Sequence, residues 1–230
     1  MKTLGILGGM SWESTIGYYK SLNEGVRERL GGLHSCKMVM NSVDFAGFAE
    51  NMGNGDWNAI SSDLIEAARS VEAGGADALI IATNTMHKAA DAVQDSVDIP
   101  LLHMADAIAV GAKNAGAKKL GLLGTAFTME QDFISKPLSD KYGLEVIVPE
   151  CEGRNFVHQT IFDELCCGKI IDKTREGYIG IIEELAAQGA EAIVLGCTEI
   201  GLLVKAEDVS VPLIDTVEVH VDLALDYIFG

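Results

Sequence analysis

Residues 192–199, which read AIVLGCTE, decide the fold, because an apolar run stops there at a glycine and polar side chains follow at once. Residues 78–85, which read ALIIATNT, repeat this design at a constant offset, and the residues leading into each segment match as well. We interpret the two segments as equivalent β-strands whose ends carry Thr83 and Cys197 at the same position. If the two ends face each other across a cleft, these side chains can flank one small molecule.

Two further blocks repeat in the same order. They are LGILG at 4–8 with LGLLG at 120–124, and VDIPLL at 97–102 with VSVPLI at 209–214. One such match is expected between any two buried strands, but three at a nearly constant spacing indicate an internal duplication.

Apolar, strand-like runs alternate with helical patterns along the whole chain. The runs lie near 3–8, 37–45, 77–83, 99–103, 119–124, 144–149, 191–196 and 211–215. This order predicts an α/β fold of two pseudo-symmetric domains, each a four-stranded parallel sheet with helices on both faces. We place the first domain at 1–98 plus 210–230 and the second at 99–209. The active site is expected between them, beyond the carboxyl ends of the strands.

The composition excludes several classes of partner. The chain has 230 residues, 48% of them hydrophobic and only 6% aromatic, which indicates an aliphatic core. A net charge of −17 argues against nucleic acid and against anionic membranes, which both require basic surfaces. No segment reaches the roughly 18 to 20 apolar residues of a membrane span. The five cysteines show no CxxC spacing and no disulfide framework, so we expect a reducing, cytoplasmic location.

Cys197 is the leading candidate for chemistry. A cysteine between a strand end and a helix meets backbone N–H groups and a positive helix terminus, and both favour the thiolate, which can act as a nucleophile or a base. Most free cysteines are inert packing residues. The polar neighbours Thr198 and Glu199 and the duplicated setting favour function here.

The other polar residues at the strand ends suit a bound carboxylate. Asn84, Thr85 and Thr198 offer amide, hydroxyl and backbone donors at helix starts, where they can also serve as caps. Thr125 lies at the end of another strand.

The remaining candidates favour structural roles. His87 is expected to be a structural residue rather than a base. His103 and Asp215 occupy equivalent positions after the fourth strand of each half and can orient neighbours. Cys166 and Cys167 are interpreted as packing or pocket-lining residues. No zinc-like spacing, phosphate loop or pyridoxal phosphate motif is present, so we expect neither a metal nor a cofactor.

Taken together, four motifs resemble the aspartate/glutamate racemase family over essentially the whole chain. They are LGGMSWEST at 7–15, NTMHK at 84–88, LGT at 123–125 with TME at 128–130, and GCTEIG at 196–201. The resemblance implies a cofactor-independent amino-acid racemase that works as a homodimer on a small amino acid. It also implies one cysteine on each side of the substrate Cα. Contacts to the α-carboxylate and α-amino groups are implied for Met10, Asn84, Thr85, Thr198 and Glu199.

This chain departs from the family pattern at Thr83, where the usual second cysteine is missing. An alcohol is a far weaker acid than a thiol, so we expect slow catalysis or unequal treatment of the two enantiomers. Residues 41–57 contain no Lys or Arg, and only Lys169 lies near Cys166 and Cys167. Because a buried carboxylate requires a counter-charge, either Lys169 reaches into the site or the substrate is not strictly acidic. Met52 and Phe45 would suit a pocket for a neutral side chain.

Two other functions stay open from the sequence. A decarboxylase or cis–trans isomerase of the same superfamily needs only one cysteine. An amino-acid binding protein could have kept the fold after losing catalysis.

Overall fold

The computed structural model describes all 230 residues and divides them into two compact units. Unit 1 comprises Met1–His103 and His220–Gly230, and unit 2 comprises Met104–Val219. The chain therefore changes unit several residues later than the positions 98 and 209 expected from the repeats. The reason is that each fourth strand stays with its own half, and the chain crosses only afterwards.

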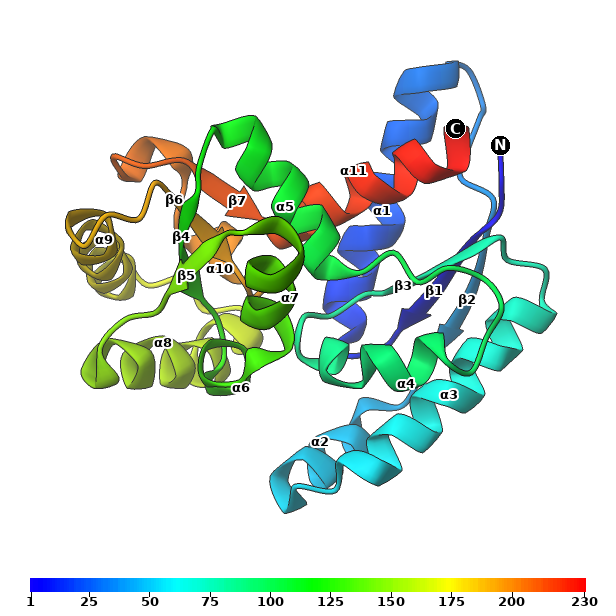
Figure 1. The fold of residues 1–230 in the computed structure, drawn as a ribbon, viewed down its shortest axis with the longest axis horizontal. Helices are drawn as coiled ribbons and strands as arrows, with labels where there is room; N and C mark the ends of the chain where they lie inside the picture. Colours follow the sequence, from blue (N-terminus) through cyan, green and yellow to red (C-terminus); the bar gives the residue numbers. More distant parts are fainter. The chain divides into compact units, whose positions relative to one another are not determined.

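Unit 1 is built on a parallel sheet with the strand order β2-β1-β3 (Figure 1). The strands are β1 (Leu4–Gly8), β2 (Met38–Ser42) and β3 (Ala78–Ile81). The fourth strand expected at 99–103 is reduced to one bridge between Leu79 and Leu101. The side chain of Gln94 binds the backbone here, accepting from the N–H of Leu101 and donating to the carbonyl of Ile99.

Unit 2 contains the complete version of the same sheet. Its strand order is β5-β4-β6-β7, all parallel, with β4 (Lys119–Leu123), β5 (Glu145–Ile147), β6 (Ala192–Leu195) and β7 (Leu213–Asp215). The order matches β2-β1-β3 followed by Leu101 in unit 1. The α/β fold with two parallel sheets flanked by helices is thus confirmed, with three strands in one sheet and four in the other.

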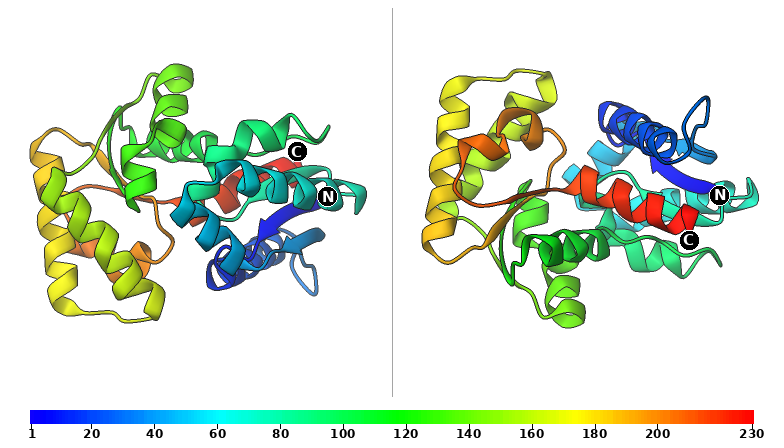
Figure 2. Two further views of the ribbon diagram at one scale, coloured as in Figure 1. Left: turned by 90° about the horizontal axis from the view of Figure 1, so that it is seen from below. Right: turned by 90° about the horizontal axis from the view of Figure 1, so that it is seen from above.

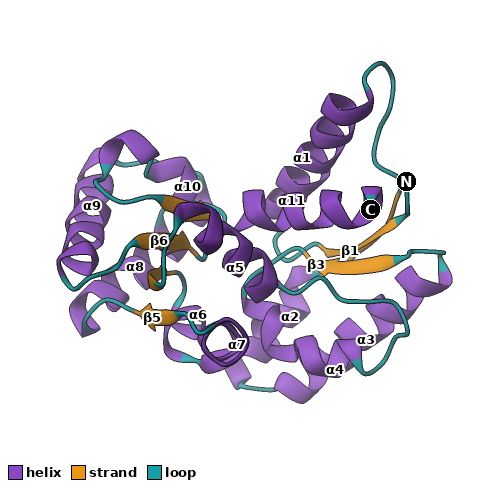
Figure 3. Ribbon diagram, turned by 45° about the horizontal axis from the view of Figure 1, so that its top comes forward, coloured by secondary structure: helices purple, strands orange, loops and turns teal.

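Helices cover both faces of the unit 1 sheet, as Figures 1 and 3 show. They are α1 (Trp12–Leu30), α2 (Phe45–Asn54), α3 (Trp57–Ala73), the 3-10 helix η1 (Thr85–Ala89), α4 (Ala90–Gln94) and α11 (Thr216–Phe229), whose first turn belongs to unit 2. α3 packs the buried side chains of Ile60, Leu64 and Val71 on one face. α1 and α11 lie on the other face and touch so closely that a Cβ at Gly25 would lie 2.3 Å from Leu225.

Unit 2 follows the same plan. Its helices are α5 (Met104–Ala115), α6 (Ala126–Glu130), α7 (Asp132–Tyr142), α8 (Cys151–Asp163), α9 (Asp172–Ala187) and α10 (Ile200–Leu203), with the 3-10 helices η2 (Leu165–Cys167) and η3 (Ala206–Asp208). α5 and α7 bury Ile108, Ile134 and Leu138 on one face of the sheet. α8 and α9 cover the opposite face, where Ile182 and Leu185 are buried (Figure 2).

None of the helices combines the length and apolar character needed to cross a bilayer.

Candidate active site

The first half-site lies just beyond the end of β3 in unit 1. The strand ends at Ile81, and the N–H of Thr83 donates to the Ile81 carbonyl at 2.8 Å, which turns the chain toward η1. Asn84 is buried, while Thr83 and Thr85 are partly exposed. The structure therefore brings these three residues together at the carboxyl end of a buried strand.

The glycine-rich turn after β1 supports this half-site. The Oγ1 of Thr15 accepts from the N–H of Gly9 at 2.8 Å and donates to the carbonyl of Ser11 at 2.9 Å. A Cβ at Gly8 would lie 2.5 Å from Thr15, so this approach requires glycine. Met10 is only 4% exposed and packs in the core of unit 1.

The segment 41–57 forms the end of β2, all of α2 and the start of α3. Met52 and Phe45 are half-buried there and pack against the core cluster that contains Met10. One cation near this segment was missed from the sequence. The Nζ of Lys88 lies 3.8 Å from the centroid of the Trp57 ring, and burial lowers the pKa of Lys88.

The second half-site lies beyond the end of β6 in unit 2. The Sγ of Cys197 donates to Glu199 Oε2 at 3.0 Å, and the hydroxyl of Thr198 donates to the same oxygen at 2.6 Å. A Cβ at Gly196 would lie 2.7 Å from the Leu123 carbonyl, so glycine allows the ends of β4 and β6 to approach. Cys197 and Thr198 thus both donate to the same carboxylate oxygen of Glu199.

The expectation of a low thiol pKa at Cys197 is wrong. The pKa lies well above the ordinary value of 9.0, first because of burial and then because of the negative charge of Glu199 and the hydrogen bond to it. The backbone N–H of Glu199 acts in the opposite direction but more weakly. Helix α10 has only four residues, so its dipole is too small to stabilise a thiolate at Cys197. At neutral pH the resting residue is therefore a thiol.

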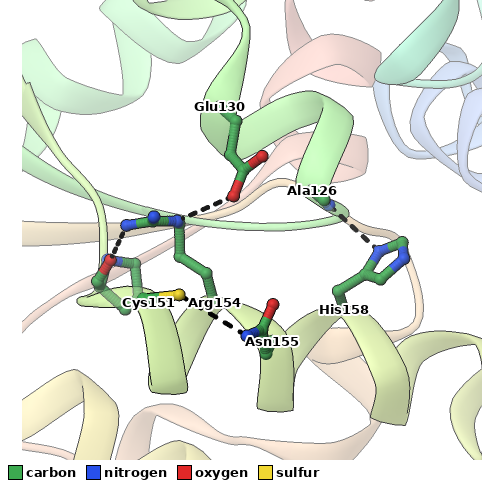
Figure 4. A network of polar contacts seen from close by, with 7 residues as sticks. Ala126, Glu130, Cys151, Arg154, Asn155 and His158 are labelled. Carbon is green, nitrogen blue, oxygen red and sulfur yellow. Dashed lines mark hydrogen bonds and ion pairs between the residues drawn. The ribbon is translucent and has the colours of Figure 1, made fainter.

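Thr125 follows β4, the neighbour of β6, and occupies the N-cap position of the short helix α6 without a capping hydrogen bond from its side chain. It is buried, and its Oγ1 lies 3.3 Å from the Oγ1 of Thr128. Figure 4 shows two side chains of α8 that reach the ends of α6: Nδ1 of His158 accepts from the N–H of Ala126 at 3.2 Å, and Arg154 binds Glu130 at 3.0 Å. α8 thus fixes the position of Thr125, a role that the sequence did not reveal.

The remaining candidates have structural surroundings. Asp215 accepts from the N–H groups of Val217 and Glu218 at the start of α11, and burial raises its pKa. The Nζ of Lys169 donates to the carbonyl of Asp163 at 3.3 Å. Cys166 is exposed, yet it is near enough to Cys197 for its charge to raise the pKa of that thiol. This is consistent with a pocket-lining role for Cys166.

No group of three or more His, Cys, Asp or Glu side chains is arranged to hold a metal ion. His87 is buried and lies with His103 and His220 behind the first half-site.

Comparison with known proteins gives a consistent picture. The sequence profile of the family described as Asp/Glu/Hydantoin racemase matches residues 7–224. A crystal structure from Yersinia pestis, of a protein proposed to be an Asp/Glu racemase, is 47% identical over 100% of both chains with a TM-score of 0.96.

Two curated proteins also match. The broad specificity amino-acid racemase RacX of Bacillus subtilis is 24% identical over 93% of this chain and 92% of its own. Glutamate racemase of Persephonella marina is 27% identical over 66% of this chain, and the match spans 57% of that enzyme's length.

Proposed function

The chain belongs to the Asp/Glu/Hydantoin racemase family, and from this premise we propose that it is a cofactor-independent amino-acid racemase. The observation that carries the proposal is the hydrogen bond from the Cys197 thiol to Glu199. It lies at a strand end equivalent to the one that carries Thr83. In this proposal Cys197 and Thr83 exchange protons with opposite faces of the substrate Cα.

Glu199 provides the route by which Cys197 becomes a base. The S–H proton moves along the existing hydrogen bond to Glu199 Oε2, and the resulting thiolate takes the Cα proton of the L-enantiomer. The ammonium group of a bound amino acid adds a positive charge, which favours the thiolate because opposite charges lower an acid's pKa. The high resting pKa of Cys197 is then lowered only when substrate is bound.

Thr83 serves the other face. Its hydroxyl can deliver a proton to the carbanion, and the reverse reaction requires it to accept one from the D-enantiomer. An alkoxide is costly near neutral pH, so the step that starts from D-substrate is the slower chemistry. Asn84, Thr85 and Thr198 are assigned to the substrate carboxylate as hydrogen-bond donors.

We propose that the substrate side chain is neutral or varied rather than strictly acidic. Residues 41–57 contain no Lys or Arg, and Lys169 binds the Asp163 carbonyl. The ammonium group of Lys88 lies over the ring of Trp57, the last residue of this segment. The similarity to RacX, whose name gives it broad specificity, agrees with this assignment.

The test is deuterium entry at Cα in D₂O for every amino acid, supplied as either enantiomer. Exchange into at least one amino acid supports the racemase. Exchange into none, together with decarboxylation of arylmalonates or isomerisation of maleate, identifies one of the other reactions of the superfamily. Binding of amino acids without any exchange identifies a binding protein.

The specificity is tested by kcat/KM for aspartate, glutamate, homoserine and methionine. A preference of about 10³ or more for an acidic substrate, roughly 4 kcal/mol, would contradict a neutral pocket. Loss of such a preference in Lys88→Met, with no change in Lys169→Met, would then identify Lys88 as the counter-charge.

We also propose a homodimer in a reducing compartment. All five cysteines are free, which suits reducing conditions. On α1, Trp12, Ile16 and Tyr19 lie on one face at 61%, 54% and 54% exposure, a stripe that a second copy of the chain could cover.

Sedimentation equilibrium tests the dimer. A monomeric mass for the native protein would refute it. Ile16→Glu should produce monomers, while Val110→Glu, an equally drastic change at an exposed residue of α5, should not.

A further inference from the structure

Behind the first half-site, unit 1 contains a cluster of aromatic and imidazole rings drawn from four distant segments. They are Tyr18 on α1, His87 on η1, His103 after the Leu101 bridge and His220 on α11. The ring of His87 lies 4.8 Å from that of His103 and 5.8 Å from that of His220, and the ring of Tyr18 lies 5.7 Å from that of His220. Tyr18, His87 and His220 are at most 2% exposed. The proposed chemistry uses none of them.

The hydrogen bonds determine the tautomer of two of these histidines. A carbonyl oxygen can only accept, so Nε2 of His220 carries the hydrogen that it donates to the Leu102 carbonyl at 2.8 Å. In the neutral ring Nδ1 is then an acceptor, and it takes the hydroxyl hydrogen of Tyr18 at 2.9 Å.

His87 has the opposite tautomer. Its Nδ1 carries the hydrogen donated to the Thr83 carbonyl at 2.8 Å. Burial, and then the charges that His103 and His220 would carry, lower the pKa of His87 well below 6.5, so the ring is neutral.

We infer that Tyr18, His220 and His87 form a positioning network that sets the direction of the Thr83–Asn84 peptide and, with it, the first half-site. The carbonyl of Thr83 and the N–H of Asn84 belong to one planar peptide and point in opposite directions. By holding that carbonyl, His87 fixes how the Thr83 hydroxyl and the Asn84 and Thr85 donors are presented.

His220 and Tyr18 act on this peptide indirectly, through His87 and the backbone near Leu102. His220 binds the carbonyl of Leu102, next to Leu101, which bridges to Leu79 in β3, and Tyr18 binds the other side of the His220 ring. The ring of His220 also packs edge-on against His87. The orientation of the turn after β3 therefore depends on helices α1 and α11, although neither carries a residue assigned to substrate chemistry.

The inference rests on the proposed function for its catalytic consequence, but its structural part can be tested in the resting protein. Imidazole ¹⁵N shifts at pH 7 should show His87 neutral with the hydrogen on Nδ1 and His220 neutral with the hydrogen on Nε2. The opposite tautomer at either ring, or a charged ring, would overturn the network, whether or not any amino acid reacts.

The catalytic part is tested by paired variants of His87. Asn places an amide donor where Nδ1 stood, whereas Leu has almost the same size and no donor. His87→Leu should lower the D-substrate exchange rate and raise KM for both enantiomers by about 10-fold each, the usual effect of a lost buried hydrogen bond. kcat for exchange from L-substrate, which Cys197 performs, should change less than about 3-fold. His87→Asn should recover most of the loss.

A second pair of variants tests the contribution of Tyr18, which binds His220 rather than the Thr83 carbonyl. Tyr18→Phe should act in the same direction as His87→Leu but more weakly. Tyr227→Phe removes a hydroxyl that donates to the Asp77 carbonyl, elsewhere in the same unit, and should have no such effect. Equal kinetics for His87→Asn and His87→Leu, or an equal loss of kcat for both enantiomers, would show that His87 is only a packing residue. If the native protein exchanges no amino acid, the proposed function fails, and the ¹⁵N shifts still decide the network.

Discussion

The two half-sites stand at equivalent strand ends but differ in how they handle protons. In unit 2, Cys197 and its acceptor Glu199 form a short, self-contained pair within three residues. In unit 1, Thr83 has a hydroxyl of low acidity, and its backbone is held by a buried histidine. The duplicated fold therefore supplies the same placement twice, while the chemistry of each end depends on which groups surround it. In the proposed mechanism the unit 2 end moves a proton through Cys197 and Glu199, whereas the unit 1 end relies on the weakly acidic hydroxyl of Thr83.

Removing the thiol should have the largest effect. Cys197→Ala should lower Cα exchange from L-substrate by about 10³-fold or more, because it deletes the only strong acid–base group assigned to this face. The measurement is deuterium incorporation by NMR or mass spectrometry. Cys151→Ala, at an exposed cysteine, is the matched control and should keep full activity. A Cys197→Ala protein that is folded and retains most of its exchange would refute the assignment.

Making the two half-sites alike should have the next largest effect. Thr83→Cys should raise exchange from D-substrate by about 10²-fold, if general-base catalysis is what that face lacks. Exchange from L-substrate should change much less. The equilibrium constant between enantiomers stays at one, so the asymmetry must appear in rates and in KM. Equal initial rates from both enantiomers in the native protein would show that Thr83 is not the limiting group.

Glu199→Gln should separate two roles of the carboxylate. Removing the negative charge lowers the thiol pKa, so alkylation of Cys197 by iodoacetamide at pH 7 should become faster. Exchange should nevertheless fall by about 10-fold or more, because the amide cannot accept the thiol proton as a base. If both rates rise together, Glu199 merely suppresses the thiolate and takes no part in the proton transfer.

Acid should destabilise the protein through unit 1. The pKa of His87 is lower in the folded state than its ordinary 6.5, so the unfolded state binds more protons below that pH. The contribution of neutral His87 is present in full above pH 6.5 and is lost as the pH falls below it. Urea unfolding between pH 7 and pH 5 should show a falling midpoint, and His87→Asn should reduce that slope. The rings of His103 and His220 face His87, and the hydroxyl of Tyr18 binds His220.

Raising the pH above 9 should destabilise the folded protein through unit 2. This is the smallest effect that we expect. The pKa of Cys197 is higher in the folded state than its ordinary 9.0, so folding retains a proton that the unfolded chain loses above that pH. The stabilising contribution is present below pH 9 and is lost as the pH rises. Cys197→Ala should therefore unfold with less dependence on pH above 9. An unchanged dependence would show that the thiol is not buried beside a charge.

The sequence predicts most of this fold because four of its strands, β1, β3, β4 and β6, are almost entirely buried. Seven of the eight predicted strand runs form strands. Continuous apolar segments such as Ala192–Leu195 are typical of strands that are buried in a parallel sheet. The run at 99–103 makes only one bridge, although Pro212 precedes β7 at the equivalent place and that strand forms, and the side chain of Gln94 binds the backbone of Ile99 and Leu101. The internal repeats predicted that Thr83 and Cys197 follow equivalent strands. The structure agrees, because β3 and β6 occupy the same place in the strand orders of the two sheets.

The electrostatics of the site were not predictable in the same way. The sequence indicated a helix after Cys197 and hence a thiolate, but that helix has one turn, and the side chain of Glu199 folds back onto the thiol. The histidine network depends on residues far apart in the chain, such as Tyr18 and His220, which are separated by 202 positions. No local sequence pattern predicts such a contact, so it is found only in the folded structure.

The late change of unit along the chain has a consequence for protein synthesis. Unit 2 is one continuous stretch, Met104–Val219, whereas unit 1 needs His220–Gly230 in addition to its first 103 residues. A ribosome releases the amino-terminal part first, yet that part cannot close its sheet face against α11 or bring His220 to Tyr18 until unit 2 has emerged. Unit 2 therefore folds from consecutive residues, whereas unit 1 has to join two segments that are separated by the whole of unit 2, which is the costlier loop to close.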